Sequence, residues 1–260
     1  MDFNRFSLVC FSPTGGTEKV GRALIGGFAD SFNFFDVTPF SKKYFSFEFT
    51  SNDFVVFALP VFGGRLPKPV VDRIRNFKGS STFCSIAVVY GNRDYEDALI
   101  ELRDLVTECG FVPVSAGAFV AEHSIARSVA HGRPDEDDFD DIRMFIEDSK
   151  SRISELGSPD DEGVLFVKGS VPYRDYSVIP VVPEAVEGCT LCMTCISECP
   201  FSAIDVRDPA KTNKDLCMSC MRCVKVCPEG VRKVSGELLS MLESKLSSLC
   251  HDRRKSEFFI

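Results

Sequence analysis

Eight of the twelve cysteines fall into two copies of one spacing, and this repeat constrains the chain more than any other feature. Each copy reads C-x2-C-x2-C-x3-C-P, at Cys189, Cys192, Cys195 and Cys199 and again at Cys217, Cys220, Cys223 and Cys227. Thiolates are ligands for soft metals, and a run this dense points to a metal centre. The proline after each last cysteine prevents a helix from continuing through the segment.

This spacing resembles that of bacterial ferredoxins with two clusters, and the resemblance covers residues 184–234. It implies two [4Fe-4S] clusters, each bound by three cysteines of one copy and the fourth cysteine of the other copy. The implied ligand sets are Cys189, Cys192, Cys195 and Cys227 for one cluster, and Cys217, Cys220, Cys223 and Cys199 for the second. Zinc ribbons also use paired C-x2-C motifs, but two full runs with Cys-Pro favour iron and sulfide.

The first 157 residues alternate short apolar runs with stretches of helical period, which is typical of a parallel sheet covered by helices. We expect strands at 6–11, 32–37, 54–59, 82–90 and 112–120. Helices are expected at 17–29, 68–77, 95–109 and 138–156. The pattern of residues 235–249 predicts a last, amphipathic helix. The final ten residues are expected to fray.

A loop rich in glycine and hydroxyl groups, Ser12-Pro13-Thr14-Gly15-Gly16-Thr17, separates the first expected strand from its helix. Backbone N–H groups, hydroxyls and the positive end of a helix together suit a terminal phosphate. The loop lacks the lysine of nucleoside-triphosphate loops and is not G-x-G-x-x-G, so ATP and NAD are disfavoured.

The loop resembles the flavodoxin phosphate motif [ST]-x-T-G-x-T, and two further loops follow later strands where doubly wound sheets bind ligands. By this resemblance the FMN phosphate would be held by Ser12, Thr14, Gly15, Gly16 and Thr17. The flavin ring would be flanked by Pro60, Val61, Phe62, Gly63, Gly64, Tyr90, Gly91, Asn92 and Tyr95. Phe62 and Tyr95 are the candidate ring-stackers, although Phe62 could equally anchor its loop. The chain has no tryptophan for this role.

The segment Glu122-His123-Ser124 follows the fifth expected strand near the same edge of the sheet. His123 would either tune a proton transfer or gate the route to a cluster. The alternative is a structural histidine with satisfied hydrogen bonds.

The whole chain resembles the flavodoxin-ferredoxin fusion proteins of anaerobes. The expected fold is α/β, with a flavodoxin-like doubly wound parallel five-stranded sheet in the order 2-1-3-4-5 and a small α+β ferredoxin-like domain. The expected divisions are 1–157 for the FMN-binding domain, 158–183 for a linker or crossover, 184–234 for the ferredoxin domain and 235–260 for a helix and tail.

The leading functional hypothesis is an electron-transfer iron-sulfur flavoprotein that passes electrons between FMN, two [4Fe-4S] clusters and a partner redox protein. A second hypothesis is a flavin-dependent reductase of a small acceptor that its ferredoxin domain supplies with electrons. No acid-base pair, nucleophile or nicotinamide site is visible in the sequence, so an electron carrier is favoured over a substrate-specific oxidoreductase. A third hypothesis is a scaffold without flavin that docks the ferredoxin domain to a partner.

The formal net charge of −8 lies in residues 1–183, with 27 acidic and 19 basic residues, whereas residues 184–234 balance at seven and seven. The absence of a basic stripe argues against nucleic acid as a partner, and the acidic part suits basic partner proteins. The sequence contains no run of about 18 apolar residues, so no membrane span is predicted. Twelve cysteines without a signal-peptide pattern favour the cytoplasm.

Overall fold

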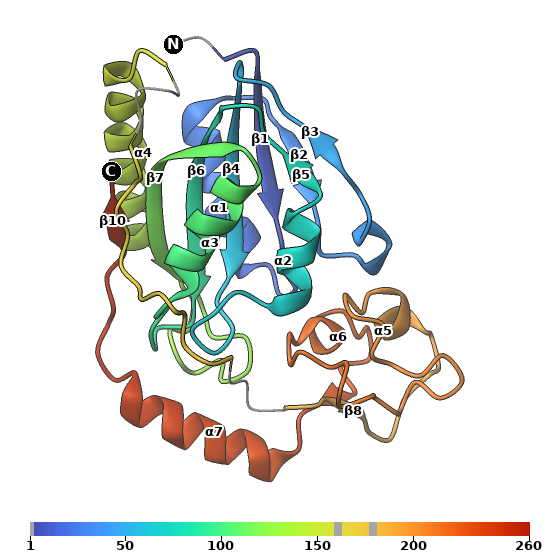
Figure 1. Ribbon diagram of the computed structural model, residues 1–260. Helices are drawn as coiled ribbons and strands as arrows, with labels where there is room; N and C mark the ends of the chain where they lie inside the picture. The colour runs from blue at the N-terminus through green and yellow to red at the C-terminus, as the bar shows by residue number, and fades with distance from the viewer. Residues whose placement is uncertain (1–2, 159–162, 177–180) are drawn as a thin grey trace.

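A computed structural model describes residues 3–158, 163–176 and 181–260 (Figure 1). Its first part runs β1 (Arg5–Cys10), α1 (Gly16–Phe28), β2 (Asn33–Asp36), η1 (Phe40–Lys42), β3 (Phe47–Glu48), β4 (Asp53–Pro60), α2 (Lys68–Ile74), β5 (Phe77–Lys78), β6 (Thr82–Tyr90), α3 (Ala98–Glu108), β7 (Phe111–Val120) and α4 (Glu136–Glu155). The rest runs β8 (Glu184–Ala185), α5 (Thr194–Ser197), α6 (Arg222–Lys225), β9 (Arg232–Lys233), α7 (Gly236–Leu249) and β10 (Glu257–Phe259).

The five main strands of the first part are parallel and lie in the order β2-β1-β4-β6-β7. This is the expected order 2-1-3-4-5, which characterises flavodoxin-like doubly wound sheets. Every residue of β4 and β6 is buried, as expected for central strands covered on both faces. The short strands β3 and β5 form a separate parallel pair.

Helices α1 and α4 cover one face of the sheet, and α2 and α3 cover the other (Figure 1). Leu8 of β1 packs in one core cluster with Leu24 of α1 and Phe145 of α4. Its neighbour Val9 packs in the second cluster with Leu102 of α3. Successive residues of β1 therefore serve different cores, because neighbouring side chains of a strand point to opposite faces.

The last residues do not fray, which corrects the expectation from the sequence. Strand β10 pairs antiparallel with β7 and makes the sheet six-stranded instead of five-stranded. The ring of Phe258 packs 5.7 Å from Phe119 and 5.3 Å from Phe145, measured between centroids. The hydroxyl of Tyr95 donates a 2.8 Å hydrogen bond to Glu257. These contacts join segments far apart in the chain, so the local pattern of residues 251–260 does not reveal them.

Residues 163–176 run along the first part of the molecule. Leu165 and Val167 are buried in the core cluster on the α3 side, whereas Val164 and Phe166 are exposed. Residues 159–162 and 177–180 of the expected linker lie outside the described residues. The domain limits at 157, 183 and 234 stay a prediction.

The cysteine-rich part is small and mixes short helices with short strands. Strand β8 pairs antiparallel with β9, and Ile204 bridges to Thr212. Met193 and Met221, at equivalent places in the two copies, precede α5 and α6 with left-handed φ angles of 60° and 61°. The two copies therefore share one local backbone form. Among the described helices, none combines the length and apolarity needed to cross a membrane.

Candidate functional site

The eight cysteines of the repeat line two separate cavities. The first cavity is lined by Cys189, Cys192, Cys195 and Cys227, and the second by Cys199, Cys217, Cys220 and Cys223. Each cavity thus contains three cysteines of one copy and one of the other, which are the two ligand sets drawn from the sequence. All twelve cysteines are free. In the described parts of the chain, no three Cys, His, Asp or Glu side chains converge closely enough to hold a single metal ion, although each cavity is lined by four cysteines.

Four sulfur donors in a cavity of their own fit the ligand chemistry of a [4Fe-4S] cluster, for which the thiols must be deprotonated. Burial raises the pKa of Cys223 to about 11 and raises that of Cys220 further. Burial also acts to raise the pKa of Cys227, but backbone N–H groups of residues 229–232 outweigh it and lower the value. Such N–H groups are the kind of donor that stabilises cluster sulfur atoms.

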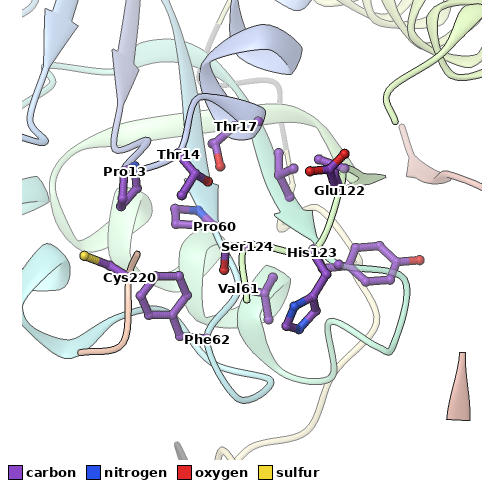
Figure 2. A pocket seen from close by; sticks show the side chains of 15 residues that line it. Pro13, Thr14, Thr17, Pro60, Val61, Phe62, Glu122, His123, Ser124 and Cys220 are labelled. Atoms are coloured by element: carbon purple, nitrogen blue, oxygen red, sulfur yellow. The ribbon is translucent and has the colours of Figure 1, made fainter. Parts of the chain in front are cut away.

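A second type of site lies at the carboxyl edge of the parallel strands, which we call the sheet-edge pocket (Figure 2). It is lined by Pro13, Thr14, Gly16 and Thr17 after β1, Pro60, Val61 and Phe62 at the end of β4, Val89, Tyr90 and Gly91 at the end of β6, Ala121, Glu122, His123 and Ser124 after β7, and Cys220. Loops after four strands therefore meet there, where doubly wound sheets bind their ligands.

The loop after β1 turns through a glycine with positive φ directly before α1. Gly15 has a φ of 97°, and a Cβ built on it would meet nothing within 4 Å. The N-cap residue Gly15 makes no side-chain hydrogen bond to α1. Ser12 closes the loop instead, because its hydroxyl accepts a 2.9 Å hydrogen bond from Glu18 N and its own N donates 2.8 Å to Thr38. Of the five residues expected at the phosphate, Thr14, Gly16 and Thr17 line the pocket.

Six of the candidate cofactor residues do not line the pocket: Ser12, Gly15, Gly63, Gly64, Asn92 and Tyr95. The amide of Asn92 donates to the carbonyls of Cys250, at 3.1 Å, and Asp252, at 2.9 Å, and so holds the chain before β10. Tyr95 is 1% exposed and bonded to Glu257, so this ring-stacking candidate belongs to the core. Of the two candidate stackers, Phe62 alone lines the pocket.

His123 lines the sheet-edge pocket and is neutral at neutral pH. Its Nδ1 accepts hydrogen bonds from the backbone N of Ile125, at 3.2 Å, and of Ala126, at 3.1 Å. Burial, with a smaller effect of the Arg93 charge, lowers the pKa of His123 to about 4. Because Nδ1 is an acceptor, the ring proton lies on Nε2. The sequence indicated only that His123 lies near this edge.

The cysteine-rich part contacts the first part through Arg73 and a pair of phenylalanine rings. Arg73 of α2 donates hydrogen bonds to the carbonyls of Thr38, at 2.9 Å, and of Pro200, which follows Cys199. The rings of Phe11 and Phe201 lie 5.9 Å apart. No local sequence signal marks Arg73 as a contact residue, because its partners come from distant segments.

A second arginine, which belongs to the cysteine-rich part, donates a hydrogen bond to the first part. Arg222 donates to the carbonyl of Pro13 in the loop after β1, at 3.3 Å, and forms an ion pair with Glu198. Cys220 stands two residues before it and lines both the second cysteine cavity and the sheet-edge pocket. The second cysteine cavity and the sheet-edge pocket therefore share Cys220 as a lining residue.

Comparison with known proteins finds one family match, in the cysteine-rich part. Residues 188–231 match the family model described as "4Fe-4S dicluster domain". No curated protein matches the chain. The family match covers the region of both cysteine runs.

Solved structures align with the first part at low identity. A flavodoxin of Streptococcus pneumonia aligns with a TM-score of 0.40 and 14% identity, covering 56% of this chain and 98% of its own. The rubredoxin oxygen:oxidoreductase of Desulfovibrio gigas gives 0.42 and 13%, covering 60% of this chain and 38% of its own. Flavodoxin 1 of Bacillus cereus gives 0.38 and 11%, covering 59% and 100%. The strand order of the sheet itself is that of a doubly wound, flavodoxin-like fold, and the segment that matches the 4Fe-4S dicluster domain model follows it in the chain.

Proposed function

We propose that this chain is an electron-transfer protein that exchanges electrons between FMN in the sheet-edge pocket and two [4Fe-4S] clusters, and then with a separate redox partner. One observation carries the proposal. Cys220, a member of the second ligand set, lines the same pocket as Thr14 and Phe62 (Figure 2). A flavin bound there would therefore lie next to a cluster ligand.

The residues of the sheet-edge pocket have suitable chemistry for FMN. Thr14, Gly16 and Thr17 offer hydroxyls and the open start of α1 to the phosphate. Phe62 provides an apolar surface for the ring. The Nε2–H of His123 would be available as a hydrogen-bond donor to a bound flavin, because Nδ1 already accepts hydrogen bonds from the backbone.

The order of the redox centres along the proposed electron route follows from the residues that line their cavities. The second cavity shares Cys220 with the pocket, whereas the first cavity includes Cys192, an exposed residue. We infer a route from the pocket to the second cluster, then to the first cluster and the partner. When bound, FMN accepts two electrons together and releases them singly, whereas each cluster carries one. The contacts of Arg73 and Arg222 hold the cysteine-rich part against the first part. The flavin and the clusters would therefore each be present at a high effective concentration near the other.

Two features of the chain suit a basic partner in a reducing compartment. The net charge is −8 and falls in the part that carries the sheet. An acidic surface favours encounter with positively charged proteins. Twelve free cysteines fit a compartment such as the cytoplasm, where thiols stay reduced.

The test of the flavin site is FMN binding by a Thr14→Val, Thr17→Val protein. Valine keeps the shape of threonine and removes the hydroxyl, so we expect FMN affinity to fall at least about tenfold, since the loss of one hydrogen bond to a charged group costs about 1.5–3 kcal/mol. Thr107→Val is the matched control, because its exposed hydroxyl bonds only to the carbonyl of Arg103 in its own helix. Equal FMN affinity in all three proteins contradicts the phosphate assignment. A wild-type protein that takes up no FMN contradicts the flavin part of the proposal and favours a docking scaffold.

A further inference from the structure

Arg232 of β9 is a buried cation beside the cysteine cavities. It is 2% exposed, and its guanidinium donates to the carbonyls of Pro183, at 2.9 Å, and Pro209, and to the hydroxyl of Thr212, at 2.6 Å. Its Nη1 also lies 3.7 Å from the Sγ of Cys195, within hydrogen-bond distance for sulfur. The oxygen partners are all neutral.

The guanidinium has no carboxylate to balance it among the residues that the structure describes. Its Nε is also buried without a hydrogen-bond partner. A buried charge costs several kcal/mol unless an opposite charge compensates it, and arginine does not lose its proton in proteins. Arg232 therefore lacks a counter-charge among the side chains that surround it.

Both ligand sets lie within reach of this charge. Arg232 lines the first cavity together with Cys195 and Cys227. Toward the second ligand set, Pro183 and Thr212 accept hydrogen bonds from the Arg232 guanidinium and also line the second cavity together with Cys217 and Cys223. One cation thus lies beside the lining residues of both cavities.

We propose that Arg232 is a buried counter-cation shared by both clusters and that it raises the reduction potential of each. The inference rests on the proposed clusters. A cluster with four thiolate ligands is anionic, and reduction adds one more negative charge. A fixed cation nearby therefore stabilises the reduced form more than the oxidised form, and an N–H donor to ligand sulfur acts in the same direction.

The test compares the midpoint potentials of both clusters in three variants by anaerobic EPR titration. Arg232→Met removes the charge and keeps most of the length of the side chain. Arg232→Lys keeps the charge and loses the planar set of donors. Lys233→Met is the matched control, because it removes a neighbouring charge that is exposed to solvent. Iron and sulfide are measured first in each protein, so that a failure of the clusters is distinguished from a failure of the inference.

We expect Arg232→Met to shift both potentials to more negative values, Arg232→Lys to restore most of the difference, and Lys233→Met to change neither potential by a comparable amount. Equal shifts in Arg232→Met and Lys233→Met would overturn the proposal, as would a shift of one cluster alone. If Arg232→Met assembles no clusters, the Arg232→Lys protein provides the test. Potentials close to the wild-type values support the proposed role of the charge, and potentials well below those values refute it. A wild-type protein without [4Fe-4S] clusters refutes the proposed function itself.

Discussion

Arg73 and Pro200 are joined by a hydrogen bond from the guanidinium to the backbone carbonyl, so that helix α2 contacts the chain directly after Cys199. The arginine is 2% exposed and also donates to Thr38 O at 2.9 Å. The guanidinium lies 5.8 Å from the ring centroids of both Phe11 and Phe201. One buried side chain of α2 thus contacts Pro200 and Phe201, which line the second cysteine cavity.

Replacing Arg73 by methionine should weaken this connection. We expect the free energy of unfolding to fall by about 2 kcal/mol, because buried carbonyls lose their donor. Anaerobic denaturant titration measures this loss. Arg75→Met is the control, because Arg75 is half-exposed and makes only surface ion pairs with Asp72 and Glu108, which are worth little. A loss no greater than that of the control would show that the contact contributes no stability.

The two cavities predict which cysteines act together. Cys199→Ala should remove the same EPR signal as Cys217→Ala, whereas Cys227→Ala should remove the same signal as Cys189→Ala. The reason is that each cavity takes its fourth sulfur from the other copy. EPR spectra of the four reduced variants distinguish the signals. The pairing is wrong if Cys199→Ala matches Cys189→Ala.

His123 makes stability depend on pH. Its pKa is lowered from 6.5 to about 4 in the folded protein, so protonation favours the unfolded state. The stabilising effect of the neutral ring is complete above pH 6.5 and is lost progressively as the pH falls toward 4. Linkage gives a loss of about 2 kcal/mol between pH 7.5 and pH 5.

The measurement is the free energy of unfolding of wild type and His123→Gln at both pH values. The variant should lack this part of the pH dependence. His131→Gln is the control, because His131 is exposed and lies outside the pocket. Identical pH profiles for wild type and His123→Gln would mean that His123 is not the titrating group.

The last strand should contribute to the stability of the sheet. Phe258 of β10 packs against Phe119 and Phe145, so we expect Phe258→Ala to cost about 3 kcal/mol. Phe166→Ala is the matched control, since Phe166 is 79% exposed and should change stability by less than about 0.5 kcal/mol. Thermal unfolding of the two variants compares them directly. Similar midpoints would mean that β10 does not stabilise the sheet in solution.

The sequence predicts the elements whose signal is local. The continuous apolar runs of β4 and β6 reveal central strands, because their period is a property of neighbouring residues. The repeated cysteine spacing predicts two ligand sets, and the cysteines of each set line one cavity. The loops near Thr14, Phe62 and Gly91 are placed correctly at the sheet edge, since parallel strands end on one side.

The remaining features depend on contacts between distant segments. Tyr95 and Glu257 are 162 positions apart, and Asn92 and Cys250 are 158 apart. Tyr95 and Asn92 are candidate flavin residues, and their side chains also hold the returning C-terminal segment through these hydrogen bonds. The contribution of Cys220 to the sheet-edge pocket depends in the same way on how the two parts pack, which no local pattern encodes.

The most direct test of the account is an anaerobic EPR redox titration of the purified protein, with iron, sulfide and flavin measured on the same sample. The account predicts about eight iron atoms and eight sulfides per chain, the content of two cubes, together with bound FMN and two cluster signals. Stoichiometric zinc without inorganic sulfide would contradict it.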